Sequence, residues 1–435
     1  MNLYGVVARY AFRLMRDDRF ALLDTQREHL FWERTRLLDN QISRLRAILS
    51  WAYENTKFYH DVFHDLGRHP NDLELPRDLE LLPVLKREHL QKQLVDLTSR
   101  CLHPNHRRLV SSGGSTGEPV KVWWDKRGWQ EGIAAQYRAY ELVEAPYGSK
   151  WLKIVGGLRH IREGRGVKAR LHDILSNRRT IIAFDLDDHS VERWVSEIKR
   201  HRPEVIFGYG GHIGLLGEYL RQHPDRLGVR VILFGGEALP NYRDYEPIFG
   251  CPVIQTYATR EVGVIAFECP ERNMHISEDT VYLETILDET GGFHRLLVTS
   301  MINRATPLIR YEIGDCGQIL PPDCSCGIPF RRLSLDIGRT PHYIRLANGR
   351  MVTHLLFAHA LKDFPVSRYQ VLVQEKRRII INVLSKATSE EEPHWIAALT
   401  SRIASQVGND IEVMVTLSNN WHITQTGKIP IIVEC

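Results

Sequence analysis

Residues 205–258 read VIFGYGGHIGLLGEYLRQHPDRLGVRVILFGGEALPNYRDYEPIFGCPVIQTYA, and this stretch decides the fold. Its apolar runs at 205–211, 229–239 and 252–258 have the composition of buried strands, and the first two run into glycine pairs. The segment IGLLGEYLRQH between them has helical spacing. Upstream, strands are expected at 150–156 and 180–186, followed by a helix at 191–201 that Pro203 ends. Strands that alternate with helices predict a layered βαβ core.

The rest of the chain flanks this core with other elements. Residues 24–65 read as helices, and residues 107–125 read as a strand, a glycine-rich turn and a second strand. After residue 262, short strands dominate. From about residue 340 a small α+β unit is expected, with a hairpin at 368–374 and 377–385, a helix at 394–408 and strands at 411–418 and 428–435. The fold class is therefore α/β with α+β elements.

Composition excludes several classes of protein. The 435 residues are 43% hydrophobic and 25% charged with a net charge of +4, which fits a globular protein and gives no nucleic-acid signature. Arg9, Arg13 and Arg16 interrupt the apolar N-terminus, so it is neither a signal peptide nor a spanning helix. Plain helix packing or fraying is favoured there over lying on a membrane surface. Seven cysteines, an odd number, argue against a disulfide framework. A cytoplasmic protein without nucleic-acid partners or transmembrane segments is expected.

The stretch SSGGSTGEPVKV (111–122) suits phosphate binding. Backbone N–H groups in such a glycine loop form an anion nest, and the hydroxyls of Ser115 and Thr116 add donors. The loop is not a Walker A motif, because no lysine follows Gly117. An ordinary polar hairpin turn is the alternative.

Six motifs in order resemble the adenylate-forming superfamily, most closely its phenylacetate–CoA ligase group and the CapK-like branch of that group. They span nearly the whole chain and are listed here with their positions: SGGSTGEP (112–119), FGGEAL (234–239), YATREVG (257–263), PLIRYEIGD (307–315), IGR (337–339) and TGK (426–428). The resemblance implies the family's two-domain fold, with a large ATP- and acyl-binding domain at 1–338 and a small mobile lid domain at 339–435. It implies activation of a carboxylic acid, an aromatic one by analogy, to an acyl-adenylate with release of pyrophosphate.

The resemblance also assigns roles in nucleotide binding. The phosphate loop would contribute Ser112, Gly114, Ser115, Thr116 and Gly117, and the adenine-side loop would contribute Gly235, Gly236 and Glu237. Tyr257 would stack on adenine, and Asp315 would accept both ribose hydroxyls. Glu261 would bind Mg²⁺, which prefers oxygen ligands. The alternatives are a core tyrosine, a turn aspartate and a surface carboxylate.

Two basic residues near the boundary complete the implied catalytic set. Arg339 would contact the ribose or phosphates, and Lys428 would bridge the substrate carboxylate and the α-phosphate. A solvated tail lysine is the alternative for Lys428. The acyl pocket would be lined by Tyr209, Gly210, Gly211, His212, Phe234, Ala258 and Thr259. The two glycines would either make room for a bulky acid or form a strand-end turn.

Four residues suit a structural zinc site: Cys269, His275, Cys324 and Cys326. Three thiolates and one imidazole are a standard zinc set, and related branches of the group show the same pattern. Separate buried cysteines and a surface histidine are the alternative.

The family hinge is altered here, because Pro341 and His342 replace two aspartates in GRTPHYI. Proline fixes φ near −65°, which puts the domain alternation, and with it the CoA step, in question. CoA is therefore one expected acceptor, and an amine, a sugar hydroxyl or a carrier-protein thiol is the alternative. A non-catalytic nucleotide-binding protein is a third hypothesis. The acid and the oligomeric state, a homodimer included, stay open.

Overall fold

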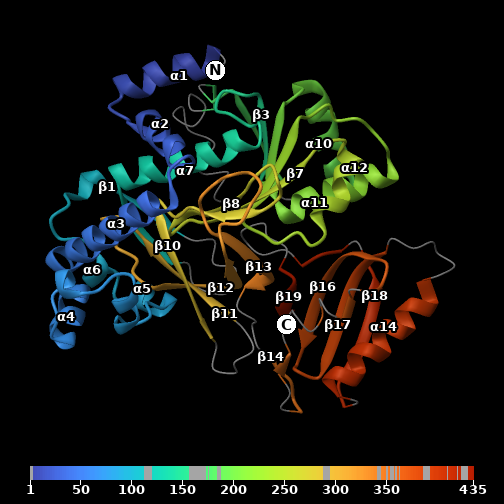
Figure 1. The fold of residues 1–435 in the computed structure, drawn as a ribbon. Helices are drawn as coiled ribbons and strands as arrows, with labels where there is room; N and C mark the ends of the chain where they lie inside the picture. The colour runs from blue at the N-terminus through green and yellow to red at the C-terminus, as the bar shows by residue number, and fades with distance from the viewer. Residues whose placement is uncertain are drawn as a thin grey trace.

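The computed structural model describes residues 3–111, 120–155, 173–174, 176–183, 188–287, 294–339, 344–348, 351–352, 357, 360–361, 363–385, 392–408, 410–418, 420–422 and 430–435. An eleven-stranded mixed sheet organises the larger part of the molecule, and a separate four-stranded sheet lies in the C-terminal part (Figure 1). Among the described residues, no helix combines the length and the apolar composition that crossing a bilayer requires.

The parallel half of the large sheet contains the strands predicted from residues 150–258. Its order is β4-β3-β5-β6-β7, and all four pairings are parallel. The strands are β3 (Trp151–Val155), β4 (Arg178–Ile182), β5 (Val205–Tyr209), β6 (Val231–Gly235) and β7 (Val253–Thr259). The intervening helices are α10 (Asp188–His201), α11 (Gly210–Gln222) and α12 (Glu246–Phe249). The predicted βαβ alternation is confirmed.

Strand β6 shows why this half must be covered on both faces. Ile232 and Phe234 pack with α10 and α11, while Val231 and Leu233 pack with the end of α7 (Lys126–Leu142). A strand that is apolar at every position is buried on both sides, as parallel sheets generally are. Figure 1 shows α11 and α12 on one side of the parallel strands, opposite α7.

The antiparallel half continues the sheet from β7 to β10. Its strands are β8 (Gly263–Glu268), β9 (Met274–Ile276), β10 (Val281–Leu287), β11 (His294–Ser300), β12 (Tyr311–Leu320) and β13 (Arg332–Arg339). Strand β12 begins only at Tyr311, although the stretch TPLIRYEIG (306–314) reads as one of the short strands expected after residue 262. Pro307 has no N–H to donate to a ladder, and Arg310 has a positive φ of 51°. The short hairpin β1 (Arg107–Ser111) and β2 (Lys121–Asp125) flanks the predicted phosphate loop, which lies outside the described residues.

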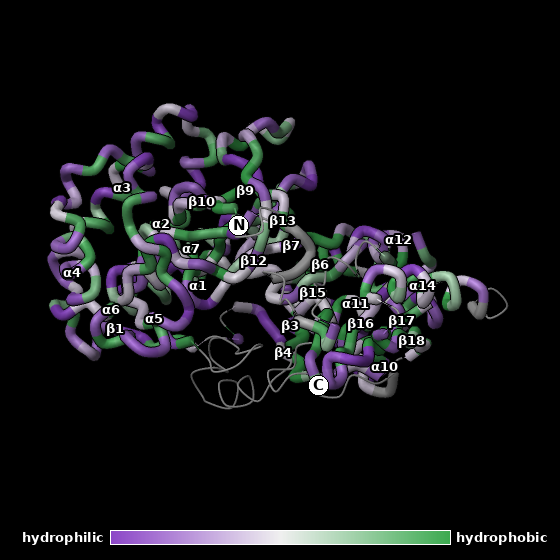
Figure 2. Tube along the Cα trace, turned by 90° about the horizontal axis from the view of Figure 1, so that it is seen from below, coloured by the Kyte–Doolittle hydropathy of each residue, from purple (hydrophilic) through white to green (hydrophobic). Residues whose placement is uncertain are grey.

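The small C-terminal sheet has its own core. Its order is β18-β17-β16-β19, formed by β16 (Val366–Gln374), β17 (Arg378–Ser385), β18 (Glu412–Leu417) and β19 (Ile432–Glu434), with α14 (Glu392–Val407) against it. A two-stranded ribbon, β14 (Ile344–Arg345) and β15 (Met351–Val352), precedes it. Figure 2 shows hydrophobic stretches in both parts of the molecule, as two separate cores require. The domain boundary at 338/339 stays a prediction.

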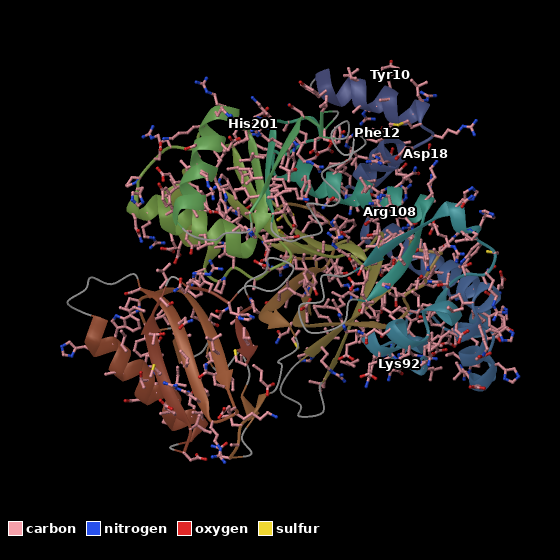
Figure 3. All side chains as sticks on the ribbon, turned by 180° about the vertical axis from the view of Figure 1, so that it is seen from behind. Tyr10, Phe12, Asp18, Lys92, Arg108 and His201 are labelled. Atoms are coloured by element: carbon pink, nitrogen blue, oxygen red, sulfur yellow. The ribbon has the colours of Figure 1, made fainter. Side chains whose placement is uncertain are left out.

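The N-terminal helices pack against the large sheet and α7. They are α1 (Leu3–Leu14), α2 (Arg19–His29), α3 (Arg34–Asn55), α4 (Lys57–Leu66), α5 (Arg87–Lys92) and α6 (Leu94–Leu97). In α1, Phe12 turns into the body beside Phe20, whereas Tyr10 points away from it (Figure 3). Helix α1 therefore packs through one face, as the sequence analysis favoured.

A buried ionic cluster ties α2 and α7 to the loop after β9. Asp279 accepts hydrogen bonds from Arg138, one of them at 3.0 Å, and contacts His29 Nδ1 at 2.7 Å. All three side chains are almost fully buried. Burial alone would raise the pKa of Asp279, but the Arg138 guanidinium and the His29 hydrogen bond outweigh it and hold this pKa well below its usual range.

We expect Asp279→Asn to destabilise the protein by about 3–5 kcal/mol at pH 7, because it leaves Arg138 buried without a counter-charge. Because the pKa of Asp279 is depressed in the folded protein, its carboxylate stabilises the fold at pH values above the ordinary carboxyl pKa. This contribution to the free energy of unfolding is lost progressively as the pH falls below about 4. Urea denaturation at several pH values measures both effects. Asp61→Asn is the control, since Asp61 is exposed and pairs with Lys57 on the surface. Equal stability of both variants would contradict the assignment.

Candidate active site and metal cluster

Three parallel strands end together at one edge of the large sheet. Tyr209 of β5 pairs in register with Gly235 of β6, and Gly235 pairs with Thr256 of β7. The carboxyl edge of a parallel sheet is where α/β proteins usually bind ligands. The sequence-predicted adenine-side loop and much of the predicted acyl pocket therefore lie side by side.

Two glycines at this edge are required by close backbone approach. A Cβ on Gly235 would lie 2.8 Å from the carbonyl oxygen of Thr256, and one on Gly210 would lie 2.8 Å from that of Glu237. Gly236 has a φ of +76°. The space that Gly210 was predicted to leave for an acid is thus filled by backbone. Gly210 and Gly211 do not form a strand-end turn but are the first residues of α11, and a role of Gly211 in the acyl pocket stays a prediction.

Two motifs that are far apart in the sequence meet at Tyr257. Its hydroxyl donates a hydrogen bond to Asp315 Oδ2 at 2.6 Å. Asp315 lies on β12, and its backbone pairs with that of Arg339 on β13. The predicted adenine and ribose residues are therefore neighbours, and the backbone of the predicted Arg339 lies beside them.

Glu261 occupies the turn between β7 and β8 and is buried. The indole N–H of Trp124 on β2 donates to the carbonyl oxygen of Arg260 at 3.2 Å. This bond ties the Glu261 turn to the strand that follows the predicted phosphate loop. The loop residues Ser112, Gly114, Ser115, Thr116 and Gly117, the hinge residues Pro341 and His342, and Lys428 all lie outside the described residues.

The predicted acyl-pocket residues differ in burial. Phe234 is fully buried and packs on Tyr242, with ring centroids 5.0 Å apart. His212 is also buried, between Trp194 and Tyr209. Tyr209, Ala258 and Thr259 are half-buried and remain reachable at the sheet edge. Their role in binding an acid stays a prediction.

The four predicted zinc ligands come together at the far end of β8 and β9. Their ligand atoms all lie within 4.8 Å of one another, with Cys269 Sγ 3.8 Å from Cys324 Sγ and Cys326 Sγ 3.3 Å from His275 Nε2. In a tetrahedron with zinc–sulfur bonds of about 2.3 Å, two sulfur atoms are about 3.8 Å apart. The donor set and its spacing therefore fit zinc.

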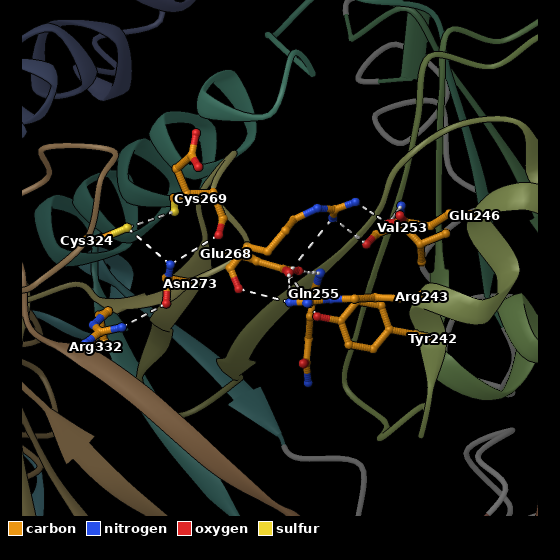
Figure 4. Close-up of polar contacts among 12 residues, drawn as sticks. Tyr242, Arg243, Glu246, Val253, Gln255, Glu268, Cys269, Asn273, Cys324 and Arg332 are labelled. Atoms are coloured by element: carbon orange, nitrogen blue, oxygen red, sulfur yellow. Dashed lines mark hydrogen bonds and ion pairs between the residues drawn. The ribbon is translucent and has the colours of Figure 1, made fainter.

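Neighbouring groups orient these ligands. His275 Nδ1 donates to the carbonyl oxygen of Phe330 at 3.0 Å, which directs Nε2 toward the cluster. Asn273 Nδ2 donates to Cys324 Sγ at 3.3 Å, and its oxygen accepts from Arg332 (Figure 4). Burial lowers the pKa of His275, which favours the neutral, metal-binding imidazole.

A buried carboxylate that the sequence analysis missed connects the cluster with the sheet edge. Glu268, directly before Cys269, accepts a hydrogen bond from Tyr242 at 2.9 Å and from the backbone N–H of Gln255 at 2.8 Å (Figure 4). Burial raises its pKa. The available sequence signal was an acidic residue at the end of the apolar run GVIAFE (263–268). The sequence could not identify its partners, because Gln255 and Tyr242 lie 13 and 26 positions away.

Known proteins resemble this chain over most of its length. Phenylacetate-coenzyme A ligase from Pseudomonas putida is 27% identical, covering 90% of this chain and 91% of that protein. Protein CapK from Staphylococcus aureus is 21% identical, covering 91% and 86%. No protein-family model matches the chain.

A solved structure of 2-hydroxyisobutyryl-CoA ligase with its acyl-adenylate, in the postadenylation state, has a TM-score of 0.71 at 17% identity, covering 91% of this chain and 89% of that one. The chain has the adenylate-forming fold and is a relative of the phenylacetate–CoA ligase group. The predicted resemblance to this group and the predicted fold class are thereby confirmed.

The same ligase in its thioesterification state gives a TM-score of 0.59, with 91% of this chain and 88% of that one again covered.

We expect Gly210→Ala to destabilise the protein by about 1–3 kcal/mol, because the new methyl group would overlap the backbone of Glu237 and Ala238. Gly132→Ala in α7 is the control, since its Cβ would make ordinary contacts no closer than 3.6 Å. There, alanine should be neutral or stabilising. Urea denaturation of both variants provides the comparison, and an unaffected Gly210→Ala would refute the close approach.

Proposed function

We propose that this protein activates a carboxylic acid with ATP to form an acyl-adenylate and then transfers the acyl group to CoA. The observation that carries the proposal is the hydrogen bond between Tyr257 and Asp315 at the sheet edge, beside the Gly235–Glu237 loop. It joins residues from two motifs 58 positions apart, to which the proposal assigns the adenine and the ribose. The relation to phenylacetate–CoA ligases over 90% of the chain supports the same activity.

In the first step, a carboxylate oxygen of the acid attacks the α-phosphorus of ATP. A new O–P bond forms, and the bond from the α-phosphorus to the bridging oxygen of pyrophosphate breaks. Tyr257 would hold the base and Asp315 the ribose, while Glu261 would hold Mg²⁺ when it is bound. The magnesium ion supplies neutralisation of the phosphate charge. Lys428 would hold the attacking carboxylate beside the α-phosphate.

In the second step, the thiol sulfur of CoA attacks the acyl carbon, AMP leaves and the thiol proton passes to solvent. The small domain at 339–435 would rotate relative to the domain at 1–338 between the steps. Transfer to an amine, a sugar hydroxyl or a carrier-protein thiol is a second proposal, which the altered hinge and the relation to CapK support. Product analysis with and without CoA distinguishes the two acceptors.

ATP–pyrophosphate exchange with a panel of aromatic and aliphatic acids tests the adenylation step. We expect exchange with at least one acid, and a loss on the order of 10²-fold or more in Lys428→Ala, since a preorganised charge in the transition state is removed. Lys376→Ala is the control, because Lys376 is exposed and pairs with Glu434 away from the sheet edge. Metal-replete protein that shows no exchange with any acid would refute adenylation.

We also propose that Cys269, His275, Cys324 and Cys326 hold one structural zinc ion per chain. Elemental analysis should find zinc in the purified protein, and Cys326→Ala should reduce both the zinc content and the melting temperature. Cys251→Ala is the matched control, since Cys251 is buried but lies outside the cluster. Full zinc retention in Cys326→Ala would contradict the ligand set.

A further inference from the structure

Arg368 connects the small C-terminal sheet to helix α11, which packs on the large sheet. It lies on β16, and its Nη1 donates to the carbonyl oxygen of Gly211 at 3.1 Å. A Cβ on Gly214, one turn further along α11, would lie only 3.7 Å from the same nitrogen. Figure 1 shows the small sheet directly beneath α11. One guanidinium therefore reaches from the C-terminal part to the first turn of α11.

Gly211, the residue that Arg368 contacts, is also held through its backbone N–H. The backbone N–H of Gly211 donates to Glu237 Oε2 at 2.8 Å. Glu237 belongs to the predicted adenine-side loop and Gly211 to the predicted acyl pocket. Burial lowers the pKa of Arg368, while Tyr245, Glu237 and Glu218 oppose this shift. Two nearby carboxylates thus favour a cation at this position.

On its own side, β16 holds the chain that flanks Lys428. The Arg368 guanidinium lies 4.8 Å from the ring centroid of Trp421. Two residues along the same strand face, the buried Gln370 binds the backbone of His422 through both its oxygen and its nitrogen, and donates to the carbonyl oxygen of Pro430 at 2.9 Å. Residues 423–429 between these anchors lie outside the described residues.

We propose that Arg368 is a positioning residue for adenylation, docking Trp421 and the Gln370-anchored residues His422 and Pro430 onto Gly211 of α11. The inference rests on the proposed function, because its purpose is to bring the lysine-bearing part of the chain to the sheet edge for the first step. Misplacement by about 1 Å can lower a rate about 10²-fold, so one directional contact between the small sheet and α11 has a large effect. A guanidinium suits this task, since its rigid fork contacts a carbonyl and an indole at once.

Three variants of the full chain test the proposal. Arg368→Met keeps the apolar stem and removes the donors, and Arg368→Lys keeps the charge without the fork. Arg402→Met is the matched control, because Arg402 stacks on Phe364 at 4.7 Å and bonds Asp363 and Ala360, all within the C-terminal part. Each is assayed for ATP–pyrophosphate exchange, for AMP release from a chemically prepared acyl-adenylate with the acceptor, and for melting temperature.

For Arg368→Met we expect the rate of ATP–pyrophosphate exchange to fall about 10- to 100-fold, which is the usual effect of losing a hydrogen bond to a charged group. The rate of AMP release from the acyl-adenylate should change less than about twofold. Arg368→Lys should recover part of the exchange, and Arg402→Met should match the wild type in both assays. An equal fall in both steps, or a fall in exchange that follows the melting temperature, would overturn the positioning role. So would an unchanged exchange rate in Arg368→Met.

Amide hydrogen exchange, measured without substrates, separates this inference from the proposed function. Arg368→Met should lose protection at residues 211–215 and 421–422, and Arg402→Met should not. Unaltered protection in Arg368→Met would overturn the docking contact. If the wild type activates no acid but Arg368→Met loses this protection, the proposed function fails while the docking contact stands.

Discussion

The close approach of backbone to backbone at the edge of the parallel strands is the constraint on which the site depends. Gly235 lies against Thr256, and Gly210 lies against Glu237, with no space for a side chain at either position. These contacts bring the ends of β5, β6 and β7 together in one register. Protein interiors are close-packed, so that even one added methyl group disturbs them. The packing of the strand ends therefore fixes where the loops beyond them begin.

The sequence predicted the large sheet well, because its strands carry uninterrupted apolar runs and its helices carry regular spacing. Boundaries were less predictable where backbone geometry decided them. Helix α11 begins at Gly210, although GG reads locally as a turn, because packing against residues 237–238 favours a helical first turn there. Likewise, β12 begins only after Arg310, whose side chain bonds the carbonyl oxygens of Glu80 and Leu82.

For the candidate site, the sequence motifs identified individual residues but not which of their side chains contact one another. The structure brings Tyr257 to Asp315 and groups the four predicted zinc ligands, while the roles of these residues stay predictions. Glu268 and Arg368 could not be found in this way, since the partners of each lie on other strands and helices, up to 157 positions away. Local sequence patterns predict which segments form helices or strands and which of their faces are buried. Contacts such as those of Glu268 and Arg368 depend instead on how whole elements pack against one another.

The cluster around Asp279 has a practical consequence for shortened versions of this protein. Helix α2 looks like a peripheral segment, yet it supplies His29 to a carboxylate in the interior and the Gln26 carbonyl oxygen to Arg138. An expression clone that starts after residue 30 would leave both Asp279 and Arg138 short of a hydrogen-bond partner beneath newly uncovered apolar surface. Limited trimming is safer within α1, whose outward face already meets solvent at Tyr10 and Leu14.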